Sequence, residues 1–217
     1  MKGFKLLLAF FLFFCIGREV LGIPPRISSP KTLNGFGQSV AIGPRFAVVG
    51  AHLEDGAGAV HIFEEGPDWG LVDTLKADDA AHGDQFGYSV AIDGHIIVVG
   101  APTEDEKGES SGAAYVFSYE SGKWRQRAKI VAPDAAADAF FGIAVSISGD
   151  TIVVGANHAE VHGQPGGAAY VFRWLDEQAT AETKLAPKGA VGTEQFGTSL
   201  CLIGDFLIVG APGFSDP

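Results

Sequence analysis

Short apolar runs alternate with glycine-containing turns along this chain, and the alternation repeats. A block of 15 residues that opens on Phe-Gly and closes on Val-Gly occurs four times without a gap, starting at Phe36, Phe86, Phe141 and Phe196. Within the block, two runs rich in β-branched residues flank a turn, and this pattern predicts a β-hairpin. A period of 50 to 55 residues indicates a repeat architecture, and the lack of a helical period excludes a helical solenoid.

Two further apolar runs follow each of the first three blocks. The third run begins with Gly-Ala at Gly58, Gly112 and Gly167, and the fourth reads VDTLKA, RQRAKIVA and AETKLAP in turn. Four short strands per period are typical of one blade of a β-propeller. We therefore predict an all-β fold of four-stranded antiparallel blades, of which about three and a half are present as an incomplete ring. A β-sandwich built from similar hairpins is the alternative.

The repeats divide the chain into three parts. We predict a signal peptide over residues 1–22, a lead-in over 23–35 and propeller repeats over 36–217. The repeats are expected to span residues 36–85, 86–140, 141–195 and, in part, 196–217. Because the last repeat stops after two strands, we interpret the chain as a fragment of a longer protein. The alternative is an open arc that self-associates through exposed blade edges.

The first residues have the pattern of a secretory signal. Lys2 and Lys5 precede an apolar run from Leu6 to Ile16, and a cleavage point is plausible near Gly22. A membrane anchor needs about 20 apolar residues, so this run is too short to span a bilayer. We therefore expect a secreted, extracellular protein with no membrane span in the mature chain.

Composition narrows the possible partners. The chain has 217 residues, of which 47% are apolar and 19% charged, enough for a substantial core. Without residues 1–22, the chain has 12 basic and 25 acidic residues, a net charge of −13. Nucleic acid is therefore not an expected partner, because phosphate binding requires a basic surface. Cys201 would be the only cysteine left, and we expect it to be a small buried strand residue.

The recurring glycines and aromatic residues have a packing interpretation. The glycine after each block's phenylalanine, and the one that ends its second strand, permit close approach of two backbones. The four phenylalanines are expected to fill the wedge between neighbouring blades. Trp69, Trp124 and Trp174 are expected to cover blade edges rather than to stack on sugars.

These residues carry a resemblance to a known family. Phe86-Gly87 with Gly100-Ala101-Pro102, repeated in the other copies, resembles the FG-GAP repeat of the integrin α-chain propeller and its microbial relatives. The resemblance covers residues 36–217. It implies an extracellular propeller, usually seven-bladed, that binds proteins or glycans and often uses calcium to brace its blades.

The chain departs from that family at the usual calcium loop. Calcium takes six to eight oxygen ligands, mostly from carboxylates at alternating loop positions. Here the first two strands of each repeat are joined by short turns that cannot supply them: Gly43-Pro44, Asp93-Gly94, Ser148-Gly149 and Ile203-Gly204. Calcium is thus possible from the resemblance, but we expect no calcium at this place and no other cofactor.

Charge is concentrated in one set of connections. In a propeller, the connections between strands two and three and between successive blades lie on one face. They correspond to residues 53–57, 77–85, 103–111, 132–140, 158–166 and 186–195. These segments hold 13 of the 25 mature acidic residues but only two lysines, so one face should be strongly acidic. Variable loops on a rigid scaffold commonly carry function.

Specific chemistry is sparse. The sequence has no nucleophile elbow, zinc-protease helix or phosphate-binding loop, and we predict a protein without enzymatic activity. His158, Glu160 and His162 share one loop and could form an open zinc site, but chance clustering of polar residues is the preferred interpretation. We therefore assign no catalytic, cofactor-binding or metal-binding residue.

Two functions from different classes remain. The first is a secreted or cell-surface recognition module that binds a protein or glycan partner, possibly cationic, through the acidic loops. The alternative is an accessory propeller domain of a larger secreted enzyme whose catalytic part is absent from this chain. Sequence beyond residue 217 would distinguish them, because further repeats favour recognition and a new domain favours the enzyme.

Overall fold

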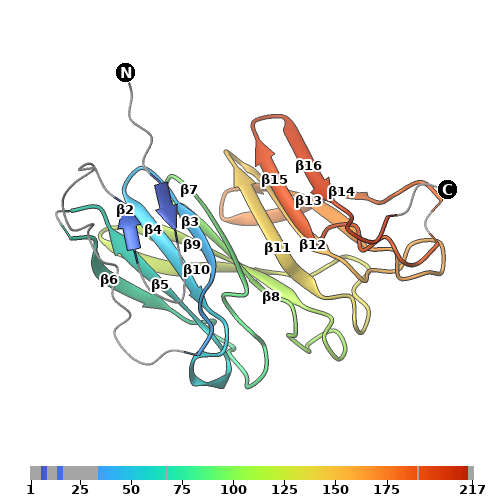
Figure 1. Ribbon diagram of the computed structural model, residues 1–217, viewed down its shortest axis with the longest axis horizontal. Coiled ribbons are helices and arrows are strands. Elements are labelled where there is room, and N and C mark those ends of the chain that lie inside the picture. Colours follow the sequence, from blue (N-terminus) through green and yellow to red (C-terminus); the bar gives the residue numbers. More distant parts are fainter. Residues whose placement is uncertain (1–5, 9–13, 17–33, 67, 190, 215–217) are drawn as a thin grey trace.

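The protein folds as a row of antiparallel β-sheets that fan out in an open arc (Figure 1). The computed structural model describes residues 6–8, 14–16, 34–66, 68–189 and 191–214. Three sheets have four strands each, and a fourth sheet has two. This confirms the predicted all-β fold with four-stranded blades. The predicted signal peptide and lead-in lie mostly outside the described residues.

Every blade is a meander in which each strand pairs with its neighbour along the chain. The first blade comprises β3 (Phe36–Ile42), β4 (Phe46–Ala51), β5 (Ala59–Glu64) and β6 (Gly70–Leu75), with a short 3₁₀ turn at Glu54–Gly56. The second comprises β7 (Ser89–Asp93), β8 (Ile96–Ala101), β9 (Ala113–Glu120) and β10 (Lys123–Ile130). The third comprises β11 (Phe141–Ser148), β12 (Thr151–Ala156), β13 (Ala168–Leu175) and β14 (Gln178–Leu185). The fourth comprises β15 (Ser199–Ile203) and β16 (Phe206–Gly210), and a separate strand pair joins β1 (Leu6–Leu8) to β2 (Phe14–Ile16).

The hairpin turns lie one residue later than predicted in three blades. Asp93 and Ile96 are paired, so the turn consists of residues 94–95, not 93–94. The glycine is therefore the first turn residue, and its φ is positive in each case, at Gly94, Gly149 and Gly204. A glycine takes this conformation without the steric cost that a side chain would add. The prediction had placed the glycine second.

The hydrophobic core lies between blades. One cluster joins Val48 and Ile62 of the first blade to Phe86, Tyr115 and Phe117 of the second. An equivalent cluster joins the second blade to the third. Phe86 and Phe141 are both fully buried in these clusters, which confirms their predicted place in the wedge between blades.

The recurring glycines form the closest contacts between blades. A Cβ added to Gly100 would lie 2.0 Å from the carbonyl oxygen of Gly142 in the next blade. Gly50 and Gly155 have the same relation to the glycine that follows the next block's phenylalanine. The Ser89 hydroxyl donates a hydrogen bond to the same Gly142 oxygen over 2.8 Å. The predicted close backbone approach is therefore confirmed, and it occurs between adjacent blades.

The tryptophans take part in this packing. Trp124 is buried in the cluster between the first two blades, where its ring meets Phe46 edge-on at 5.3 Å. Trp174 is buried in the cluster between the second and third blades, and Trp69 packs on a smaller cluster of the first blade.

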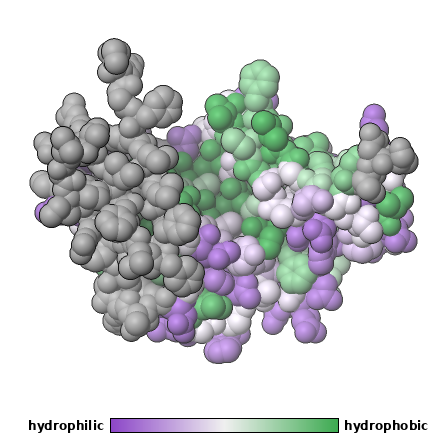
Figure 2. Space-filling model, viewed as in Figure 1, coloured by the Kyte–Doolittle hydropathy of each residue, from purple (hydrophilic) through white to green (hydrophobic). Residues whose placement is uncertain are grey.

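The outer face of the fourth sheet is exposed, and this overturns one prediction. Figure 2 shows an apolar surface over β15 and β16, where Phe206, Ile208 and Ile203 are 81%, 72% and 71% exposed. Ile208 aligns with Val98 of β8 and Val153 of β12, and both of these valines are fully buried by the following blade. Cys201 lies on the same face and is exposed, not buried as its small-residue position predicted.

Candidate functional site on the acidic loop face

The long connections meet at one side of the molecule. In Figure 1 the hairpin tips point upward, and the connections between strands two and three and between blades gather along the lower edge. Hydrogen bonds join loops of the two kinds: Gly83 N–H donates to the Gly56 oxygen over 2.8 Å, and Asp138 N–H donates to the Glu109 oxygen over 2.7 Å. The acidic segments that the sequence assigned to one face therefore form one continuous loop surface.

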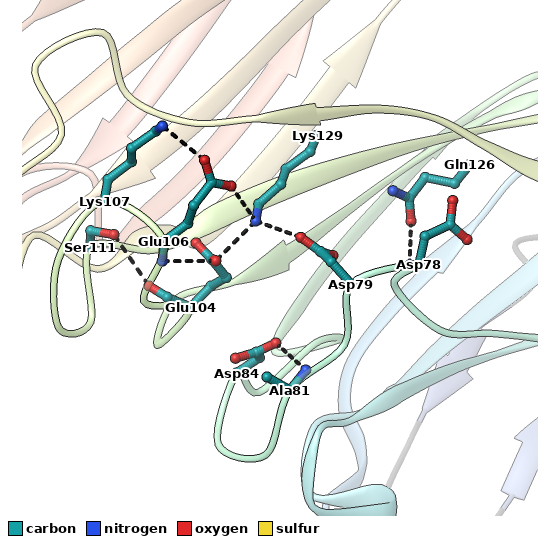
Figure 3. A network of polar contacts seen from close by, with 10 residues as sticks. All are labelled: Asp78, Asp79, Ala81, Asp84, Glu104, Glu106, Lys107, Ser111, Gln126 and Lys129. Carbon is teal, nitrogen blue, oxygen red and sulfur yellow. Dashed lines mark hydrogen bonds and ion pairs between the residues drawn. The ribbon is translucent and has the colours of Figure 1, made fainter.

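A lysine lies at the centre of the most acidic part of this surface (Figure 3). The Lys129 ammonium, which rises from β10, is 2.6 Å from Asp79 Oδ2, 2.9 Å from Glu104 Oε1 and 2.8 Å from Glu106 Oε2. Asp79 belongs to the connection between blades, whereas both glutamates belong to the loop between β8 and β9. One ammonium thus ties together two loops and a strand.

The charges in this network shift one another's pKa values. Burial disfavours the charged ammonium of Lys129, but its bonds to the three carboxylates outweigh burial and raise its pKa. Lys107 and Lys129 both bond to Glu106 and lower its pKa to about 2. Burial tends to raise the pKa of Asp79, but the bond to Lys129 prevails and lowers it. Lys129, Asp79 and Glu106 are therefore charged at neutral pH.

These three carboxylates are the one group among the described residues whose arrangement could suit a metal ion. One ligand atom from each of Asp79, Glu104 and Glu106 lies within 4.8 Å of the other two. The Lys129 ammonium already bonds to all three, so it takes the place that a cation would need. A buried oxygen beside it, Glu104 Oε2, has no hydrogen-bond partner among the described residues. Oxygen ligands of this kind suit a hard cation such as calcium or magnesium.

The same positions recur in the other blades with different side chains. In the third blade, Lys184 bonds to Asp134 over 2.6 Å, and the Tyr170 hydroxyl donates to the same carboxylate over 2.8 Å. Asp134 lies seven residues before its block's phenylalanine, as Asp79 does before Phe86. The lysine and aspartate positions therefore belong to the repeat.

In the first blade, histidine replaces this tyrosine. His61 is buried, and its Nε2 lies 2.6 Å from Glu54 Oε2 while its Nδ1 lies 3.1 Å from Thr74 Oγ1. Glu54 occupies the position of Glu104, and Thr74 that of Lys129. Each of the three blades therefore buries a histidine or tyrosine where its third and fourth strands approach the loop face.

The contacts between adjacent blades, which we call the seams, and the contacts of the loop face both recur from blade to blade. Comparison with known families also finds a repeated unit. The profile of the FG-GAP repeat matches residues 31–63, 69–117 and 124–172, more than half of the chain. The chain belongs to the FG-GAP repeat family. No curated protein matches it. The phenylalanines and glycines that define the repeat lie in the seams between blades. Family membership therefore explains the scaffold but not the residues of the loop face.

Two of the connections between FG-GAP repeats are held by a buried acid two residues before the phenylalanine. The Asp84 carboxylate accepts a hydrogen bond from the Ala81 N–H over 2.7 Å. Glu194 accepts three from Val191, Gly192 and Thr193 over 2.6 to 3.0 Å, and these bonds lower its pKa. Burial, together with nearby acidic groups, raises the pKa of Asp84. The sequence alone does not indicate that Asp84 and Glu194 are buried, because both lie in polar loops.

The predicted charge of the loop face is partly neutralised by strand residues. Lys129 and Lys184 of the fourth strands, and Lys76 directly after β6, pair with loop carboxylates. The sequence count missed them because it included only loop residues. The sequence does contain an indication of these lysines. Each of the fourth apolar runs has a lysine near its end, next to the following loop.

A small cavity opens on this face beside the second and third FG-GAP repeats. It has a volume of about 230 Å³ and is lined by Ala136, Ala137, Asp138, Ala139, His158, Glu160, Gly163, Gln164 and Pro165. His158, Glu160 and His162 do not form a zinc site in the described part of the chain, because their possible ligand atoms do not come together as a group of three. The ring of His158 instead meets Phe140 edge-on at 5.0 Å.

Several carboxylates of this face remain free of ion pairs. Glu109, Asp138 and Glu160 are exposed, and none of them pairs with a basic side chain in the part of the chain that the structure describes. In the same part of the chain, no helix has the length and apolar character needed to cross a bilayer.

Proposed function

We propose that this FG-GAP protein is a secreted or cell-surface recognition module, without enzymatic activity, that binds a protein or glycan partner through its acidic loop face. The observation that carries the proposal is the set of exposed, unpaired carboxylates beside the small cavity: Glu109, Asp138 and Glu160. The blades hold these loops on a rigid scaffold, which is the usual arrangement for binding residues. A partner that presents cationic groups fits this chemistry.

The charge pattern supports a docking role over solubility alone. Asp79 and Asp134 of this face are paired with strand lysines, and the buried Asp84 and Glu194 accept backbone hydrogen bonds. The unpaired carboxylates instead flank a concave, alanine-lined surface. Charges that surround a concavity concentrate the electrostatic field and raise the rate of association with an oppositely charged partner.

A model ligand tests the electrostatic part of the proposal. A fluorescent oligolysine peptide of about ten residues would be titrated with the protein at about 50 and 300 mM salt, since exposed charges are largely screened at the higher value. Binding should be saturable and should weaken steeply with salt. The triple variant Glu109→Gln, Asp138→Asn and Glu160→Gln should weaken binding at least about tenfold.

A matched control removes the same charge from the opposite face. Asp68, Asp176 and Asp205 are exposed residues in or beside the hairpin turns, and the variant Asp68→Asn, Asp176→Asn and Asp205→Asn should bind like the unmodified protein. Equal loss in both variants would show attraction to net charge alone and would overturn the proposal. So would binding that does not change with salt.

A further inference from the structure

The second strand of the fourth blade has an open pairing edge. Among the described residues β16 pairs only with β15, whereas β4, β8 and β12 each pair on both sides. An open edge presents unpaired N–H and C=O groups that can accept another strand. This edge lies apart from the acidic loop cavity, so the inference is independent of the proposed function.

The three complete blades show what such an edge accepts. In them the second strand pairs with a segment that reads Gly-Ala, then valine or alanine, then histidine or tyrosine, a β-branched residue and phenylalanine. The register is constant: Val99 faces Tyr115, and Val154 faces Tyr170. By the same register, Val209 of β16 faces the aromatic position of an added strand, and Leu207 faces its phenylalanine.

The packing surface for that strand already exists on the third blade. In the second blade, Tyr115 and Phe117 cover Ile62 and Leu75 of the first blade, which are 0% and 6% exposed. Tyr170 and Phe172 likewise cover Val116 and Ile130 of the second blade, which are 0% and 4% exposed.

The corresponding residues of the third blade, Val171 and Leu185, are only partly buried. They form a ledge beside the open edge of β16, and this ledge lacks the aromatic cover that both earlier blades have. Backbone groups and apolar surface are thus left open at the same place.

We propose that β16 and the ledge of Val171 and Leu185 bind an extended strand of the third-strand type, Gly-Ala-Ala-aromatic-Val-Phe, by strand addition. Main-chain hydrogen bonds to β16 would supply affinity, and the two aromatic side chains would select the sequence by covering the ledge. The continuity of this surface with two interfaces of the same kind in the chain defines the occupant.

A peptide from the chain itself tests the proposal. A fluorescein-labelled peptide with the sequence of residues 111–120, SGAAYVFSYE, would be titrated with the full chain at a concentration where sedimentation shows a monomer. We expect saturable binding and slower amide hydrogen exchange at Phe206–Gly210. A peptide with Tyr115→Pro and Val116→Pro should bind at least about tenfold more weakly, because proline removes ladder hydrogen bonds.

A protein variant locates the contact. Leu185→Asp places a charge on the ledge and should reduce peptide affinity at least about tenfold while circular dichroism stays unchanged. The comparison of the two peptides uses the unmodified protein, so it remains valid even if Leu185→Asp is less stable. Equal binding of both peptides, no protection in β16, or pairing of β16 with a second copy in place of the peptide would overturn the proposal.

Discussion

At the scale of single residues, stability depends on glycines that lie directly against the backbone of the next blade, where a Cβ atom would not fit. The seam between the second and third blades brings Gly100 against the Gly142 carbonyl, and the Ser89 hydroxyl bonds to the same oxygen. A methyl group at Gly100 would separate the two backbones and weaken this bond. The glycines at the ends of the second strands are therefore packing residues, with no need for an unusual φ at Gly50, Gly100 or Gly155.

Replacing one of these glycines should loosen the adjoining blades. Gly100→Ala should lower the free energy of unfolding by about 3 kcal/mol, because its Cβ would lie 2.0 Å from a backbone oxygen that cannot rotate away. Urea denaturation measures the change. Gly70→Ala is the matched control, since nothing lies within 4 Å of its added Cβ and its φ is not positive. A loss of similar size in both variants would contradict the seam as the cause.

The charge of Lys129 also acts at the residue scale, and its effect should depend on pH. Lys129→Met should lower the free energy of unfolding by about 2 kcal/mol at neutral pH, because the buried Glu104 carboxylate loses its ion-pair partner. The folded-state pKa values of Asp79 and Glu106 lie below their ordinary values. Their contribution to stability is therefore present above the unfolded-state pKa values and is lost as pH falls towards about 2.

Thermal unfolding of both proteins between neutral and acidic pH measures this dependence. The difference between the unmodified protein and Lys129→Met should shrink as pH falls from about 4.5 to about 2, where these carboxylates become protonated. Lys123→Met, on the exposed part of the same strand, serves as the control and should differ little at any pH. A difference that stays constant with pH would contradict an electrostatic role for Lys129.

At the scale of the elements, periodicity predicted the strands and their order, because each strand follows from local sequence. The blocks at Phe86 and Phe141 gave hairpins near the predicted places, with the turn shifted by one residue. The Lys129 network could not be predicted in the same way, since it joins Asp79 and Lys129, which lie 50 residues apart, through two loops. The exposure of Cys201 was also beyond local sequence, because it depends on what covers the sheet.

The two loops and the strand that meet at Lys129 should accept a metal ion once the ammonium is removed. Lys129→Ala leaves Asp79, Glu104 and Glu106 with ligand atoms within 4.8 Å of one another, and the second carboxylate oxygen of Glu104 lies beside them without a hydrogen-bond partner. Millimolar calcium should therefore raise the melting temperature of Lys129→Ala, through binding to the folded state alone, and leave the unmodified protein unchanged. The double variant Lys129→Ala, Glu104→Gln should lose the response. An equal shift in the unmodified protein would show that calcium binds elsewhere.

At the scale of the whole molecule, the fan of blades has one apolar surface that nothing in the structure covers. In the second and third blades the equivalent face is buried against the following blade. On β15 and β16 the face is uncovered, and Phe206, Ile208 and Ile203 are exposed. A contiguous apolar patch of this kind commonly mediates association. Contact between this face and a different part of a second copy would be heterologous and could extend beyond a dimer.

Self-association of this chain should therefore be concentration-dependent and should be reduced by a charge on that face. Sedimentation velocity of the full 217-residue chain should show an average mass that rises with concentration for the unmodified protein and stays close to 22.6 kDa for Phe206→Asp. Leu175→Asp changes an exposed leucine at the end of β13 and should leave the association unaffected. The exposed Cys201 supplies a second measurement, because its reaction with a thiol reagent should slow as the face becomes covered. If the mass does not depend on concentration while Cys201 stays fully reactive, the face is not an association surface. If Phe206→Asp abolishes association but still binds the strand peptide, the sheet face and the β16 edge are separate surfaces that act independently.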